Sequence, residues 1–141
     1  MAFQKVTAGR EALGDFAPQF AALNDDVLFG EVWSREKQLS PRDRSIITVT
    51  SLMTSGIFDS SLSFHLQKAK ENGVTGGEIA EILTQLAFYS GWPKAWAAFR
   101  LAKDIWAKED STPGPDGTDK SGIFPLGQPN DAFAPYFTGR S

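Results

Sequence analysis

His65 is the only histidine of the chain, and an imidazole is the side chain best suited to proton transfer near neutral pH. Ser61 precedes it by four residues, so a helix would bring the hydroxyl close enough to the ring for a nucleophile and its base. The sequence beside them offers neither an acidic residue to orient the ring nor an oxyanion loop, and serines near a helix start are usually caps. Histidines within helices are also more often structural than catalytic. Both roles therefore stay open for His65.

Three charged residues could work with that imidazole. Arg42 and Arg44, in the segment PRDR, carry guanidinium groups that bind carboxylates in a directional, bidentate way. A cation is unfavourable near a helix N-terminus, so at least one of them should have a specific partner such as Glu31, Asp43 or a ligand, although a solvated first turn is the simpler alternative. Glu31 lies among apolar residues in FGEVW, where desolvation would raise its pKa toward that of a general acid. An ion pair with an arginine explains Glu31 equally well.

Aromatic residues accompany these candidates. Trp33 belongs to an apolar stripe with Phe29, and Tyr89, Trp92 and Trp96 cluster around a Gly-Trp-Pro sequence. We interpret the second group as core or subunit contacts, with lining of a pocket as the alternative.

Composition excludes several kinds of site. The chain has 141 residues, no cysteine and one histidine, so disulfides, thiolate metal sites and a multi-histidine metal cage within one subunit are ruled out. A net charge of -3 argues against a protein that coats the phosphate backbone of nucleic acid. No apolar run is long enough for a membrane span and no leader sequence is visible. We therefore expect a cytoplasmic protein with no metal, nucleic-acid or membrane partner.

The elements that must position these residues are helices. Apolar residues recur at intervals of three and four, which predicts an all-α fold of about six helices in antiparallel hairpins. Their starts are expected at or near Arg10, Asn24, Ser40, Asp59 or Ser60, Thr75 and Pro93. We expect the first helix to reach about Ala22 and the second, with Asp25 and Asp26 in its first turn, to reach about Lys37.

Start and stop signals mark several of these helices. Ser40, Pro41 and Asp43 form a typical helix N-terminus, and Gly56 is suited to end that helix in the left-handed conformation. Thr75 followed by Glu78 is a capping box. Asn72-Gly73 and Gly91-Trp92-Pro93 are predicted breaks. The lone histidine thus falls on a helix between Asp59 and Asn72, with Leu62, Leu66 and Ala69 on its inward face.

The composition changes at about residue 110. Residues 111–122 are rich in Pro, Gly and Ser, which is typical of a linker, whereas 123–137 carry aromatic residues among prolines without a regular period. We therefore divide the chain into a helical domain, 1–110, and a linker with an irregular C-terminal arm, 111–141. The arm either packs on another subunit or folds back on its own helices.

The order and spacing of LFGEVWSREKQLSPRDRSIITVTSLMTSG, the histidine of SFH, and KENGVTGGEIAEILTQLAFYSGWPKAW resemble the carboxymuconolactone decarboxylase family, the Cys-less relatives of the alkylhydroperoxidase AhpD. The resemblance implies an AhpD-like helical bundle that forms homotrimers or homohexamers. Phe58 and Ser61 stand where the peroxidase branch has its two cysteines, so thiol chemistry does not transfer. Ser45 stands where an acidic residue often follows the family's arginine. The C-terminal segment resembles linkers to a cupin barrel, which suggests a cupin-domain partner.

The resemblance implies a cofactor-free lyase that acts on a small carboxylated lactone or a related intermediate of aromatic catabolism. His65, Glu31 and Arg44 would be catalytic. The residues expected around the substrate are Arg42, Ser45, Ser61, Trp33 and Tyr89. Two alternatives remain, namely a hydrolase or isomerase of a related lactone or quinone, and a ligand-binding or assembly module without catalysis.

Overall fold

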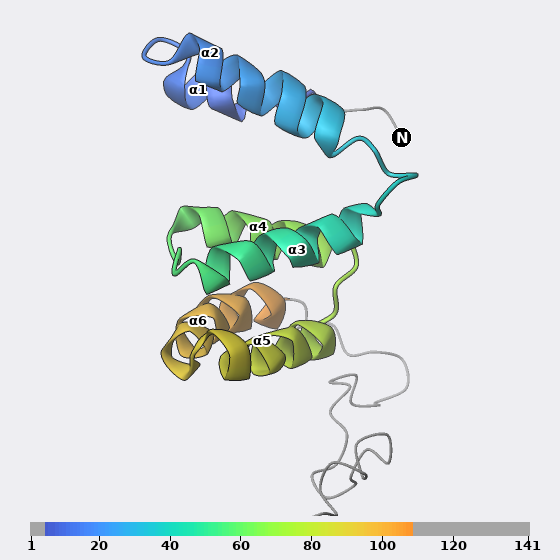
Figure 1. Cartoon of the computed structure of the whole chain (residues 1–141), viewed down its shortest axis with the longest axis vertical. Coiled ribbons are helices and arrows are strands. Elements are labelled where there is room, and N and C mark those ends of the chain that lie inside the picture. The colour runs from blue at the N-terminus through green and yellow to red at the C-terminus, as the bar shows by residue number, and fades with distance from the viewer. Residues whose placement is uncertain (1–4, 109–141) are drawn as a thin grey trace, which may run out of the picture.

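The computed structural model describes residues 5–108, and all regular elements in this range are helical (Figure 1). Six α-helices and one π-helical segment follow one another as α1 (Ala8–Leu13), α2 (Pro18–Ala22), η1 (Leu23–Val32), α3 (Pro41–Thr54), α4 (Ser60–Glu71), α5 (Gly76–Ser90) and α6 (Trp92–Ala107). The predicted all-α class is confirmed. The predicted C-terminal arm, 111–141, lies outside the described residues, so the proposed boundary near residue 110 stays a prediction.

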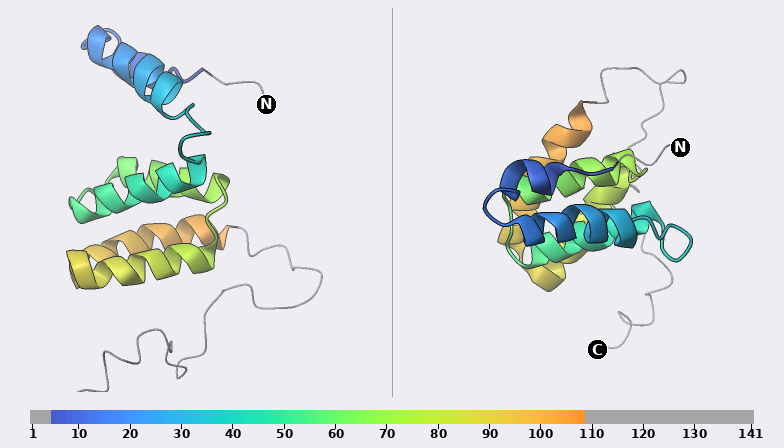
Figure 2. Two further views of the ribbon diagram at one scale, coloured as in Figure 1. Left: turned by 45° about the vertical axis from the view of Figure 1, so that its right-hand side comes forward. Right: turned by 90° about the horizontal axis from the view of Figure 1, so that it is seen from above.

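The helices form three antiparallel hairpins arranged in layers (Figures 1 and 2). We call α1, α2 and η1 together the N-terminal hairpin, and α3 to α6 the helical body. Within the body, α3 pairs with α4 and α5 with α6, and α6 also packs against α4. The N-terminal hairpin occupies a layer of its own beyond α3 and α4.

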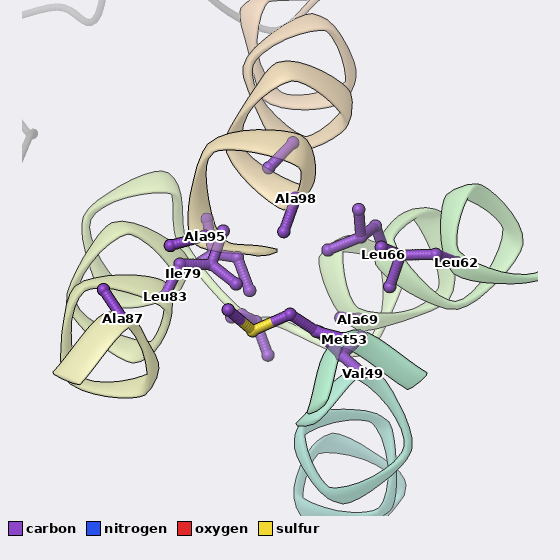
Figure 3. Close-up of a cluster of buried hydrophobic side chains, with 12 residues drawn as sticks. Val49, Met53, Leu62, Leu66, Ala69, Ile79, Leu83, Ala87, Ala95 and Ala98 are labelled. Carbon is purple, nitrogen blue, oxygen red and sulfur yellow. The ribbon is translucent and has the colours of Figure 1, made fainter. Parts of the chain in front are cut away.

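The hydrophobic core lies inside the helical body. All four helices contribute buried side chains, with Met53 of α3 reaching toward α5 and α6 (Figure 3). The twelve buried members of this core are Val49, Met53, Leu62, Leu66, Ala69, Val74, Ile79, Leu83, Ala87, Ala95, Ala98 and Ala102. Alanines on α6 let it approach its neighbours closely. The inward face predicted for the helix of His65 is confirmed.

Local capping sets the limits of α3 and α4. The Ser40 hydroxyl accepts a hydrogen bond from the N–H of Asp43 at 3.1 Å, and Pro41 occupies the first turn. Gly56, with φ of +76°, turns the chain after α3 in a conformation that side chains disfavour. The Asp59 carboxylate accepts from the N–H of Ser61 at 2.9 Å and starts α4. These predicted signals are confirmed.

The capping box at the start of α5 is also confirmed. The Thr75 hydroxyl accepts from the N–H of Glu78 at 3.1 Å, and the Glu78 carboxylate accepts from the N–H of Thr75 at 3.2 Å. Gly91, with φ of +113°, separates α5 from α6. The Trp106 indole donates to the carbonyl of Val74 at 3.0 Å and ties the end of α6 to the loop before α5.

The sequence-based prediction was wrong for the N-terminal hairpin. The helix expected from Arg10 to Ala22 is two helices, because the chain turns after Leu13 and restarts at Pro18. Asn24 does not cap a new helix, since α2 continues into η1 without a break. The second helix also ends at Val32 and not near Lys37.

Asp25 explains this difference. Its side chain is buried and accepts hydrogen bonds from the N–H of Gly9 at 2.8 Å and of Arg10 at 3.0 Å, the first-turn amides of α1. Asp25 therefore caps α1 across the hairpin and does not start its own helix. Its partners lie 15 and 16 residues away in sequence, so no local pattern reveals them.

None of the helices in residues 5–108 has both the length and the apolar character needed to cross a lipid bilayer.

Candidate active site around His65

His65 lies on α4, half-buried between two aromatic rings. The Trp33 ring stacks on the imidazole with centroids 6.0 Å apart and an interplanar angle of 18°, and the Phe64 ring meets its edge at 5.0 Å. The Phe29 ring in turn packs against the rings of Trp33 and Phe64, with centroid distances of 6.2 Å and 6.5 Å. We call Phe29, Trp33, Phe64 and His65 the aromatic cluster. It joins the end of η1 to α4 and gives the imidazole apolar walls.

This environment keeps the imidazole uncharged. Burial lowers the pKa of His65 below its ordinary value of 6.5, and the positive charge of Lys68 lowers that pKa further. At neutral pH the ring is therefore neutral, with one N–H donor and one bare nitrogen acceptor.

The Nδ1 atom of His65 is buried and has no hydrogen-bond partner in the described part of the chain. A buried polar atom without a partner carries a desolvation cost, and native proteins rarely leave one unless a ligand, water or functional role compensates. Nδ1 is therefore an atom at which a ligand would gain a hydrogen bond that the fold itself does not supply.

Glu31, predicted to accompany His65, is exposed at the end of η1. Within residues 5–108 its carboxylate forms no ion pair or hydrogen bond with His65, Arg42 or Arg44, and its carbonyl accepts from the hydroxyl of Ser34 at 2.9 Å. Both Glu31 and Trp33 lie near the end of η1, but only Trp33 contacts the imidazole.

Arg42 has a partner that the sequence did not suggest. Its guanidinium forms an ion pair with Glu78 of α5 and lies 3.8 Å from Asp43. Glu78 therefore has two roles, since one carboxylate oxygen completes the capping box and the other binds Arg42. The expected pairing of one arginine with Asp43 is therefore found, but the additional ion pair with Glu78 holds α3 to α5 and lies outside the aromatic cluster.

Arg44 is less completely bonded. Its Nη2 donates to the carbonyl of Arg35 at 3.2 Å, whereas its Nε is buried and has no partner in the described residues. Arg44 is thus held by one contact and keeps a buried, charged donor to spare. In residues 5–108, only Arg44 and His65 have a buried side-chain nitrogen without a hydrogen-bond partner.

Ser45 is completely buried, and its hydroxyl accepts a hydrogen bond from the Asn72 amide at 2.9 Å. Asn72 also donates to the carbonyl of Pro41 at 3.3 Å, so it ties the end of α4 to the start of α3. In this chain Ser45 has no surface to offer a substrate and serves helix packing.

The remaining predicted residues are exposed. Ser61 lies one turn before His65, as expected, but its hydroxyl makes no hydrogen bond to the imidazole. Tyr89 is 82% exposed at the end of α5 and makes no ring contact with the aromatic cluster within the described residues.

The structure therefore brings only His65 and Trp33 together from the predicted set. Phe64 and Lys68 were missed, although Phe64 directly precedes His65 in the sequence and Lys68, three residues after His65, lies near it on a helical projection. The pairs Arg42–Glu78 and Ser45–Asn72 could not be found this way, because each joins residues far apart in sequence.

Among residues 5–108, no three histidine, aspartate or glutamate side chains are grouped so that they could hold a metal ion. An open hollow of about 310 Å³ is lined by Pro93, Trp96 and Arg100 on α6, none of which belongs to the aromatic cluster.

Comparison with known proteins gives a consistent result. Residues 18–104 match the family described as the carboxymuconolactone decarboxylase family. The chain is 34% identical over 101 residues to the 4-carboxymuconolactone decarboxylase of Acinetobacter baylyi, which covers 72% of this chain and 74% of that protein. It is 27% identical over 100 residues to an uncharacterized 15.0 kDa protein of Paracoccus denitrificans from the nqo9-nqo10 intergenic region, covering 70% and 74%.

Proposed function

Because this chain belongs to the carboxymuconolactone decarboxylase family, we propose that it is a lyase that removes CO2 from a small carboxylated lactone without a cofactor. The relative from Acinetobacter baylyi, named 4-carboxymuconolactone decarboxylase, supplies the first substrate to consider.

The reaction has a definite electronic demand. The bond between the ring carbon and the carboxylate breaks, CO2 leaves, and the electron pair that formed this bond moves into the unsaturated lactone carbonyl. The carbonyl oxygen becomes an enolate oxygen, and a carbon atom then takes up one proton. Donors aimed at the developing enolate oxygen lower the barrier, and they act most strongly where water is excluded.

The observation that carries this proposal is the buried, unpartnered Nδ1 of His65 between aromatic walls. In the tautomer protonated at Nδ1, the neutral imidazole donates that N–H to the enolate oxygen. The lowered pKa of His65 supports this role, because burial disfavours the imidazolium at neutral pH and leaves a neutral donor. Trp33 and Phe64 provide the low dielectric in which such a hydrogen bond is strongest.

Arg44 is the better candidate to hold a carboxylate of the substrate. Arg42 is already neutralised by Glu78, whereas Arg44 binds a main-chain carbonyl and keeps its buried Nε free of any partner in the described residues. A guanidinium with an unused donor gains most from an incoming carboxylate. Glu31, which is exposed, would take a proton from solvent and deliver it to carbon, directly or through water.

The test is CO2 release from 4-carboxymuconolactone by the purified chain. His65→Gln should lower kcat by about 10²- to 10³-fold, the usual contribution of one hydrogen-bond donor to a developing oxyanion. Gln67→Ala, an exposed position on the same helix, is the matched control and should keep full activity. Unchanged turnover in His65→Gln would remove the histidine from the mechanism, and the absence of CO2 release by the wild-type chain would overturn the lyase assignment.

The second candidate function is a ligand-binding module without catalysis. It is favoured by the internal bonding of Arg42 and Ser45, which leaves few polar groups for chemistry in residues 5–108. Such a module would bind the lactone with a measurable Kd and return it unchanged. A lactone hydrolase or isomerase would instead consume the lactone and give a product that retains the carboxylate carbon, so lactone consumption and CO2 release together separate all three outcomes.

A further inference from the structure

The segment that carries the aromatic wall of His65, η1, is a π-helix over ten residues, Leu23–Val32. In a π-helix each N–H bonds the carbonyl five residues earlier, as the N–H of Trp33 does with Leu28 at 3.0 Å. This geometry is rare and is mostly limited to a single turn within an α-helix, frequently at a functional site. A π-helix of this length therefore needs contacts elsewhere in the molecule that favour it.

Such contacts fix both ends of η1. Near its start, the buried carboxylate of Asp25 accepts hydrogen bonds from two main-chain amides of α1. At its end, the Trp33 ring stacks on His65 of α4, and the carbonyl of Arg35 then accepts from Arg44 of α3. The two ends thus bind different layers of the molecule (Figure 1). The segment between them must have the rotation that satisfies both.

The number of residues per turn decides whether both contacts form at once. An α-helix has 3.6 residues per turn, whereas a π-helix, with its longer hydrogen-bonded rings, has about 4.4. Over the eight residue steps from Asp25 to Trp33, the difference accumulates to about 0.4 of a turn. With Asp25 bonded to α1, an α-helical segment would therefore turn Trp33 around the helix axis and away from His65.

Gly30 permits the π-helical geometry. A Cβ atom at this position would lie 3.3 Å from the carbonyl oxygen of Asp25, which is the acceptor five residues earlier in the chain. A side chain here would therefore crowd the hydrogen bond that defines the π-helix. Glycine is also a poor α-helix former, so it does not favour the competing geometry.

Phe29 moves with Trp33. The two rings are stacked with centroids 6.2 Å apart and an interplanar angle of 21°, and Phe29 also meets the edge of Phe64 on α4. Residues four apart lie on the same side of the helix in either geometry. A change in the geometry of η1 would therefore take both rings away from α4 together.

We propose that η1 is a positioning element for His65. Its π-helical geometry, which Gly30 permits, holds Trp33 and Phe29 against α4 while Asp25 stays bonded to α1. Conversion of η1 to an α-helix would keep the contact with α1, remove the Trp33 wall and expose the imidazole to water. In the proposed decarboxylation, the π-helix would thus keep His65 a neutral donor, and this consequence alone rests on the proposed function.

The experiment compares Gly30→Ala with the wild-type full chain. Alanine crowds the Asp25 carbonyl and has the higher α-helix propensity, so η1 should become α-helical. In a crystal structure of the variant, the N–H of Trp33 should then bond Phe29, four residues earlier, in place of Leu28. The first-turn amides of α1 should stay as protected from hydrogen exchange as in the wild type, because the contact with Asp25 is kept.

The imidazole of His65 gives the second readout, since the sole histidine yields a single ring signal in NMR. In Gly30→Ala this signal should lose the shift caused by the ring current of Trp33. Its pKa should rise toward the ordinary value, because the burial that lowers it most is relieved, while Lys68 stays in place on α4. Gln19→Ala, at an exposed position of α2, is the matched control and should leave the signal and the pKa unchanged.

A second variant tests the rotation itself. Deletion of Val27 from Gly30→Ala leaves seven residue steps between Asp25 and Trp33. Seven steps of an α-helix bring Trp33 back to within about an eighth of a turn of its direction in the wild type. The stacking on His65, and with it the wild-type pKa, should therefore return. An unfolded hairpin would not give this recovery.

Three results would overturn the proposal. Unchanged histidine signals in Gly30→Ala would show that the geometry of η1 does not position Trp33. Loss of amide protection in α1 would mean that the substitution unfolds the hairpin and does not change its helix type. Failure of the shortened variant to restore the imidazole signals would contradict the rotation. None of these readouts uses CO2 release, so this proposal and the proposed function can fail separately.

Discussion

Different interactions stabilise the N-terminal hairpin and the helical body. The body buries twelve apolar side chains, eleven from its four helices and Val74 from the loop before α5, while the hairpin buries one carboxylate and two small residues. The first derives its stability from removing apolar surface from water, and the second from hydrogen bonds and ion pairs centred on Asp25. The difference indicates that the body folds as the stable unit, and that the hairpin is an attachment whose shape depends on a few polar contacts.

The largest effect should come from a cavity in the body. Leu66 is fully buried, so Leu66→Ala should lower the free energy of unfolding by about 2 to 5 kcal/mol. Leu28→Ala removes a residue that is 42% exposed in the hairpin and should cost less than about 0.5 kcal/mol in the dissociated monomer. Urea denaturation of both variants at low concentration makes the comparison. Equal costs would mean that the hairpin has a covered core within its own chain.

Asp25→Ala should open the hairpin and leave the body folded. Loss of the carboxylate leaves the N–H groups of Gly9 and Arg10 without their acceptor. We expect protease cleavage in the turn between α1 and α2, a partial loss of helical signal, and an unchanged unfolding transition of the body. Asp26→Ala, which removes only a half-exposed partner of Arg10, is the control and should leave the turn protected.

Lowering the pH should open the hairpin while the body stays folded. Burial pushes the pKa of Asp25 upward, but hydrogen bonds from Asn24 and from the main chain of Arg10 and Gly9 outweigh burial, so the net pKa lies below its ordinary value. The contribution of Asp25 is therefore complete above the unfolded pKa of about 4 and is lost as pH falls through the folded value. Amide exchange at low pH should show α1 opening before α4. Simultaneous opening would contradict the division into two regions.

His65 reports the contact between the two regions. As the sole histidine it gives a single imidazole signal in NMR, and its pKa should lie below about 6.5. Because the folded pKa is lower than the unfolded one, the unfolded chain binds the proton more tightly, so stability should fall as pH drops below about 6.5. Trp33→Ala exposes the ring and should raise the pKa toward its ordinary value. A pKa that does not respond would place Trp33 away from the imidazole.

A small effect should come from the ion pair between Arg42 and Glu78. Their side chains are 36% and 43% exposed, so the pair should contribute about 0.2 to 1 kcal/mol. Glu78→Gln removes the charge and keeps a side chain that can complete the capping box. A double-mutant cycle with Arg42→Gln measures the pair alone. A coupling well above 1 kcal/mol would show that the body, like the hairpin, depends on polar contacts.

Sequence reasoning succeeded where the stabilising interaction is local. Ser40, Asp59 and Thr75 each cap a helix through a backbone N–H two or three residues further along, so their patterns are visible in any short window. It failed where the partner is remote. Aspartate is a residue type that favours the first turn of a helix, so Asp25 was assigned to one. The amides that it binds belong instead to a helix that ends twelve residues earlier, at Leu13.

The candidate site shows the same distinction between local and remote interactions. The sequence by itself determined the family, the all-α class and the helix that carries His65, because caps, breaks and apolar spacing act over one or two turns. Only the tertiary structure decided which polar groups are already bonded. It pairs Arg42 with Glu78 and Ser45 with Asn72, and leaves buried atoms of His65 and Arg44 without a partner in the described chain. Hydrogen bonds between distant helices decide this, and their energy depends on distances in the folded chain and not on spacing in the sequence.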